Sequence, residues 1–240
     1  MRVLAFLICL EVIMPAYSSE RTKRLALTAI FASLAFLVTL IPAPKVQFLS
    51  FDIKDTVIAL ASLILGPGAA VALSILVPLL EAISVGTTGP WGFLMDVIST
   101  MSFSLTVSLI YKFRKTLGGA VLALVSAAFV QVAMMMLANI VITPLYTGAP
   151  RSVVIGMLLP LLLPFNAVKS VFNAALVMLL YKPTVETLRR ARILRAPAST
   201  GKGYHFGGRS LLVLSVSLVV TVAAALLLFL VLGAAWESSV

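Results

Sequence analysis

The stretch LLPFNAVKSVFN, residues 162–173, lies within a long apolar run and yet contains Asn166, Lys169 and Asn173. A lysine near the middle of a membrane segment costs about 2.5–3.5 kcal/mol on insertion scales, so it needs a compensating partner. The three polar residues are spaced i, i+3 and i+7, which places them on one face of a helix over about 10 Å. The stretch therefore predicts a membrane helix whose polar face lines a cavity or meets a partner.

The composition of the whole chain agrees with a membrane protein. Of its 240 residues, 61% are hydrophobic and 11% are charged, whereas soluble domains have about 45–50% apolar and 25% charged residues. The apolar runs are continuous and helix-length, unlike the alternating segments of about ten residues in a β-barrel. We therefore expect an all-α polytopic protein of the cell membrane. The single cysteine, Cys9, and the lone histidine, His205, argue against a disulfide framework and against a metal or catalytic centre, so we expect no enzyme, metal or cofactor.

Seven spans are expected from the apolar runs, since about 20 residues cross a hydrocarbon core of about 30 Å. They lie at residues 25–41, 56–65, 68–85, 93–111, 119–142, 164–181 and 211–235. The second is short and ends at Gly66-Pro67, a turn and helix-start signal, which predicts a half-length or strongly tilted helix. Because Pro160 and Pro164 interrupt the run before the sixth span, we expect residues 153–163 to form an interfacial or re-entrant loop.

The basic residues predict the orientation of the spans. Thirteen Lys and Arg residues lie before the first span, after the fourth, and between the sixth and seventh, against Lys45, Lys54 and Arg151 on the other side. The positive-inside rule then makes the thirteen cytoplasmic. The net charge of +10 therefore indicates topology and contact with lipid headgroups rather than nucleic-acid binding. We divide the chain into an uncertain extension or signal-like segment (1–20), a six-helix membrane domain (21–183), a basic cytoplasmic linker (184–209) and an extra transmembrane helix (210–240).

Further polar residues are expected at the same outer level of the membrane as the polar face of 162–173. A polar-lined outward cavity roofed by loops explains them together, because buried polar groups need partners. Simpler roles remain open: an N-cap at Asp52 or Asp55, a structural ion pair between Glu81 and Lys169, and a helix-dipole contact at Asp96. The candidate binding residues are Asp52, Glu81, Asp96, Asn139, Tyr146, Asn166, Lys169 and Asn173.

The order of several short motifs resembles the riboflavin-specific S components of energy-coupling factor (ECF) vitamin transporters. The motifs are FDIKD (51–55), GPGA (66–69), TGPWG (88–92), NIVITPLY (139–146) and LPFNAVKSVFNA (163–174). The resemblance implies a six-helix membrane protein that binds one vitamin in an outward pocket under its first outer loop. It also implies transport with an ECF module of a membrane T subunit and two ABC-type ATPases, and flavin contacts from Asn139, Asn166 and Lys169.

The chain also departs from the family pattern. Ser74 and Val77 stand where the family often has Glu and Lys, and Asp96 where it often has Asn. FMN or another vitamin therefore remains an alternative ligand, and so does an autonomous ion-coupled transporter that uses Glu81, Asp96 and Lys169 as a relay. An ATP-hydrolysing transporter in its own right is excluded, because the chain has no G-x-x-x-x-G-K-[ST] motif.

Overall fold

The computed structural model describes residues 20–41, 45–46, 49–86, 89–114, 116–190, 215–216, 219–220 and 222–223. The predicted N-terminal extension lies outside this part except for residue 20, and so does the basic linker beyond residue 190. The predicted seventh span is described only in its three short pieces, which are helical. The division of the chain into these regions stays a prediction.

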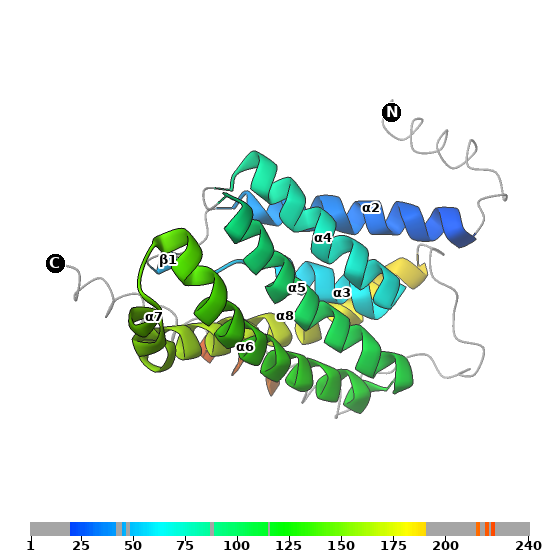
Figure 1. Cartoon of the computed structure of the whole chain (residues 1–240). Coiled ribbons are helices and arrows are strands. Elements are labelled where there is room, and N and C mark those ends of the chain that lie inside the picture. Colours follow the sequence, from blue (N-terminus) through cyan, green and yellow to red (C-terminus); the bar gives the residue numbers. More distant parts are fainter. Residues whose placement is uncertain are drawn as a thin grey trace.

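The described chain is a bundle of helices with one hairpin whose strands are two residues long (Figure 1). The elements in order are α2 (Glu20–Thr39), β1 (Lys45–Val46), β2 (Leu49–Ser50), α3 (Lys54–Leu65), α4 (Pro67–Ser84), α5 (Gly89–Phe113), α6 (Leu117–Thr147), α7 (Arg151–Met157), the π-helix η1 (Leu158–Leu162) and α8 (Leu163–Arg190). Within the residues that the structure describes, five segments are long and apolar enough to cross a membrane: Arg21–Thr39, Pro67–Ser84, Gly89–Phe113, Gly118–Thr147 and Arg151–Leu188. The expectation of a polytopic α-helical membrane protein is confirmed.

Helix α3 is the short helix that the sequence predicts, and it forms the centre of the bundle. It has 12 residues, or about 18 Å of helix, too little for a hydrocarbon core of about 30 Å. Ten consecutive residues, from Lys54 to Leu63, are buried, because α2, α4, α5 and α8 all pack around it. Gly66 then turns the chain into α4 with φ 94° and ψ −177°, a conformation that is essentially restricted to glycine.

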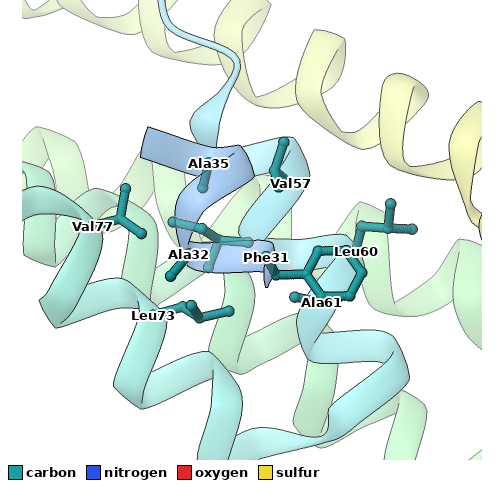
Figure 2. Close-up of a cluster of buried hydrophobic side chains, with 9 residues drawn as sticks. Phe31, Ala32, Ala35, Val57, Leu60, Ala61, Leu73 and Val77 are labelled. Atoms are coloured by element: carbon teal, nitrogen blue, oxygen red, sulfur yellow. The ribbon is translucent and has the colours of Figure 1, made fainter. Parts of the chain in front are cut away.

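One apolar cluster joins the first three helices at the buried face of α2. Phe31, Ala32 and Ala35 of α2 pack on Val57, Leu60 and Ala61 of α3 and on Leu73 and Val77 of α4 (Figure 2). The small residues of α2 allow its backbone to approach α3 closely, as is common in membrane helix pairs. Val77 is fully buried in this apolar cluster.

Serine hydroxyls link α3, α4 and α5 below the predicted cavity. Ser62 donates to the carbonyl oxygen of Ser104 at 3.1 Å, and the Ser74 and Ser104 hydroxyls lie 2.9 Å apart. Ser108 donates to the carbonyl oxygen of Ser62 at 3.1 Å. Interhelical hydrogen bonds of this kind contribute about 0.6 kcal/mol each on average inside membranes, so they fix the register of three helices more than they add to stability.

The expectation of an interfacial or re-entrant loop at residues 153–163 is wrong, because these residues are helical throughout. Helix α7, η1 and α8 follow one another without a non-helical residue from Arg151 to Arg190. A proline lacks the N–H that an α-helix needs and clashes with the preceding turn. The wider π turn around Pro160, followed directly by the first turn of α8 at Pro164, takes up both prolines within helical structure. The sixth span is thus longer than expected and includes a π-helix, an element found mostly at functional sites.

Candidate functional site

A cavity of about 380 Å³ opens at the end of the bundle where α4 ends and α5 begins. Its wall combines residues from the end of α2, the β2 strand, α4, α5, α6 and α8, so segments distant in sequence meet there. Pockets for small ligands span about 300–1,000 Å³, and this one lies within that range. Six of the eight predicted residues line it: Asp52, Glu81, Asp96, Tyr146, Asn166 and Lys169.

The β2–α3 loop, residues 51–53, is held on α8 by aromatic contacts, and this fixes Asp52 at the cavity. Phe51 packs edge-on against Phe165 at a ring-centroid distance of 6.2 Å and against Phe172 at 5.1 Å. The next residue, Asp52, accepts a hydrogen bond from Lys169 Nζ at 2.8 Å. Both side chains of this ion pair are only 9% exposed, so each charge depends on the other.

Lys169 therefore pairs with Asp52, and the alternative of an ion pair between Glu81 and Lys169 is wrong. Asp52 lies in the loop outside the membrane-spanning helices. Burial alone would raise the pKa of its carboxyl group, but the ammonium groups of Lys169 and Lys54 bring that pKa below its usual range. Its second oxygen, Oδ1, is buried without a hydrogen-bond partner. An ionised carboxylate is an acceptor only, so Asp52 brings acceptors and no donor to the cavity wall.

Lys54 is the main functional candidate that sequence reasoning misses. The orientation argument treats it as an outer charge, but it is 1% exposed and lies in the first turn of α3. Its Nζ forms ion pairs with the carboxylates of Glu81 and, at 2.9 Å, of Asp96. Lys54 thus lies behind the cavity wall and holds two of its acidic residues. The available signal is the lysine between two aspartates of FDIKD, directly before an apolar helix.

A second polar cluster lies deeper, below the cavity. Asp55 accepts hydrogen bonds from Thr100 and from Gln131 Nε2, both at 2.8 Å. Gln131 Oε1 in turn accepts from Ser170 at 2.8 Å, so α3, α5, α6 and α8 are joined by one network. The N-cap role considered for Asp52 or Asp55 is wrong, because Ile53 is the N-cap of α3 and has no side-chain cap.

Asn139 and Asn173 lie near the cavity but not in its wall. Asn139 donates to the carbonyl oxygen of Met135 and accepts from Thr143 within α6. Asn173 accepts a hydrogen bond from Thr56 and donates to the carbonyl oxygen of Lys169 at 3.1 Å. Their contact with a ligand stays a prediction. In their place the wall includes Met135, whose soft side chain suits a flat aromatic ligand.

Comparison with known proteins identifies the family. The model of the ECF transporter substrate-specific component matches residues 23–181. "Riboflavin transporter FmnP" of Bacillus subtilis (strain 168) is 28% identical over 193 residues, which cover 72% of this chain and 99% of that protein. "Riboflavin transporter RibU" of Staphylococcus aureus (strain TCH60) is 27% identical over 181 residues, or 71% of this chain and 95% of that protein.

A solved structure agrees in fold. This structure, described as "Structure and mechanism of the S component of a bacterial ECF transporter", superimposes with a TM-score of 0.61 at 25% identity, covering 71% of this chain and 99% of that one. The profile match spans well over half of the chain, and the architecture agrees with it. The chain therefore belongs to the substrate-specific (S) components of ECF transporters, the multi-pass membrane subunits that bind the transported substrate.

Proposed function

We propose that this S component binds riboflavin in the cavity between the β2–α3 loop and α4, α5, α6 and α8. The observation that carries the proposal is the pairing of Lys169, on α8, with the loop residue Asp52 at the cavity wall. The two relatives, both named as riboflavin transporters and matched over nearly their whole length, support the identity of the vitamin.

The chemistry of the wall suits the two ends of a flavin. An isoalloxazine ring offers carbonyl and ring-nitrogen acceptors, which an ammonium group and an amide N–H group can approach as donors. Lys169 and Asn166 are the donors on the α8 side of the wall. Met135, Phe93 and Phe165 supply apolar surface for the rings. The ribityl chain carries hydroxyl donors, and Asp52 brings a carboxylate acceptor to the cavity wall.

The binding proposal is tested by titrating the purified protein in neutral detergent with riboflavin and following the quenching of flavin fluorescence. Saturable quenching by wild type that is strongly weakened in Lys169→Met is expected. Lys112→Met is the matched control, because Lys112 is exposed at the far end of α5 and should leave the affinity unchanged. Absence of quenching by folded wild-type protein would remove riboflavin as the ligand.

We further propose that transport by this chain depends on an ECF module. The S components of this family work with a membrane T subunit and ATPases. On α2, Ala29 and Ser33 are exposed and give a small-xxx-small pair that allows close helix contact, so we assign the T-subunit contact to this face. Uptake into cells or vesicles should require both the module and ATP. Uptake by the S component alone, abolished by a protonophore, would instead favour the autonomous ion-coupled transporter.

A further inference from the structure

We propose that Lys54 is the positioning residue of the cavity. Its ammonium group is the counter-charge that allows two wall carboxylates, Glu81 and Asp96, to lie close together, and it thereby holds the end of α4 against the start of α5. The inference rests on the proposed riboflavin function. It adds a residue that acts on the ligand only through these two carboxylates, because Lys54 is not among the lining residues of the cavity.

Three helices meet at the Lys54 ammonium group. Lys54 lies in the first turn of α3, and its side chain is 1% exposed. Its Nζ forms ion pairs with Glu81, in the last turn of α4, and at 2.9 Å with Asp96, in the second turn of α5. Both carboxylates line the cavity. Lys54 therefore determines where two hydrogen-bond acceptors of the wall lie, although it does not itself reach a ligand.

The two carboxylates need this ammonium group in order to lie so close together. Two oxygens that contact one nitrogen at hydrogen-bond distance are at most about 6 Å apart. At that distance each carboxylate disfavours the charge of the other, unless a positive group lies between them. Among the described residues, Lys54 is the one basic side chain that forms an ion pair with either of the two. Without it, the end of α4 and the start of α5 carry two adjacent negative charges.

The other titratable groups around Lys54 increase this dependence. The carboxylates of Asp52, on the preceding loop, and of Asp55, in the first turn of α3, also attract the Lys54 ammonium group. Lys169 of α8 is already engaged by its ion pair with Asp52. Tyr146 of α6, which also lines the cavity, is neutral below about pH 10. Removal of Lys54 would therefore leave one ammonium group for all four carboxylates.

The deeper packing of the same helices does not depend on Lys54 in this way. Below the cavity, α3 and α4 share an apolar cluster, and the Ser74 and Ser104 hydroxyls join α4 to α5. The side chains of Glu81 and Asp96 are 21% and 28% exposed, so without Lys54 they can turn towards water and separate. Loss of Lys54 should therefore distort the cavity wall more than it unfolds the bundle.

Riboflavin titration and thermal unfolding of Lys54→Met in detergent, between about pH 8 and about pH 5.5, test the inference. At about pH 8 the variant should bind riboflavin at least about tenfold more weakly than wild type, which corresponds to one lost hydrogen bond to a charged group. As the pH falls, one of the two carboxylates takes up a proton and the repulsion between them disappears. The affinity and the unfolding temperature of Lys54→Met should then rise towards those of wild type. Lys112→Met is the matched control and should follow wild type at each pH.

Removal of a second charge distinguishes this role from simple packing. Glu81→Gln in the Lys54→Met background should restore the riboflavin affinity to that of Glu81→Gln alone, because one carboxylate of the pair is then neutral. Lys54→Arg, which keeps the positive charge, should bind riboflavin more tightly than Lys54→Met. Wild-type affinity in Lys54→Met would overturn the inference. So would a loss of affinity that neither the lower pH nor Glu81→Gln restores, since Lys54 would then act through its packing.

The test also separates failure of this inference from failure of the proposed function. If Lys54→Met does not fold by itself, Glu81→Gln should restore a folded protein, and a double variant that stays unfolded would overturn the inference. If folded wild-type protein binds no riboflavin, the proposed function fails. The unfolding temperatures then still test the role of Lys54 without a ligand, and an identical pH dependence in wild type and Lys54→Met would overturn it.

Discussion

Replacing Lys169 by methionine should damage both the stability and the ligand affinity of this S component, for two separable reasons. Lys169 and Asp52 are joined at 2.8 Å with side chains that are only 9% exposed. Removal of one partner of a buried ion pair costs about 3–5 kcal/mol, because the remaining charge is left uncompensated. For a domain of 150–250 residues this corresponds to a loss of roughly 6–20 °C in unfolding temperature.

The double variant Lys169→Met with Asp52→Asn separates the two effects. With neither charge present the penalty for an uncompensated buried charge disappears, so most of the lost unfolding temperature should return. The riboflavin affinity should not return, because the charged donor to the ring is still missing. A hydrogen bond to a charged group contributes about 1.5–3 kcal/mol, or about 10- to 150-fold in the dissociation constant.

The assay combines thermal unfolding in detergent with riboflavin titration for wild type, both single variants and the double variant. If the two losses in unfolding temperature simply added in the double variant, the ion pair would not be the source of either. If Lys169→Met bound riboflavin within twofold of wild type, Lys169 would have no part in the binding site.

Three further predictions concern the framework around the cavity. Gln131→Leu should lower the free energy of unfolding by about 1–3 kcal/mol for each buried group left without a partner, since the Gln131 amide joins the Asp55 carboxylate to the Ser170 hydroxyl. Met134→Leu, on the exposed side of the same helix, is the control. Equal unfolding temperatures for the two variants would show that these hydrogen bonds do not stabilise the fold. Gly66→Ala should lower the free energy of unfolding by about 1–3 kcal/mol, because Gly66 has a φ of 94° that alanine adopts only with strain. Gly68→Ala, in ordinary helix with open space around it, should leave the unfolding temperature unchanged or raise it slightly. Similar effects of the two substitutions would refute the conformational reason. Tyr111→Phe removes one hydroxyl of a 2.6 Å pair between α5 and α8 and should cost about 1 kcal/mol in unfolding. It should not change the riboflavin affinity, since Tyr111 lies about 18 Å along α5 from Ser99, the nearest cavity-lining residue of that helix. A weakened affinity would show coupling between the two ends of the helix.

Much of the fold can be predicted from short stretches of sequence, without knowledge of which distant segments they contact. The Gly66-Pro67 pair predicts the break between α3 and α4, and the length of the preceding apolar run predicts that α3 is too short to span the membrane. The shared face of Asn166, Lys169 and Asn173 predicts a polar side of α8. Each of these depends on local backbone chemistry or on helix periodicity, which are properties of neighbouring residues in the chain.

The errors come from interactions between distant segments. The partner of Lys169 depends on where the loop before α3 lies, and that is fixed by the packing of Phe51 on α8. From the sequence, Lys54 is predicted to be an exposed charge of a loop. The packing of α4 and α5 places Glu81 and Asp96 next to it, so it is a buried ion-pair partner. Pro160 and Pro164 are ordinarily helix breakers, but a π turn accommodates them. None of these outcomes follows from the spacing of residues along the chain.

The most direct test of riboflavin binding by this S component is calorimetric titration of the purified wild-type protein with riboflavin, thiamine and biotin. Riboflavin selectivity predicts saturable binding of riboflavin with one site per chain and no binding of the other two vitamins. Binding of another vitamin by folded protein that ignores riboflavin would contradict it.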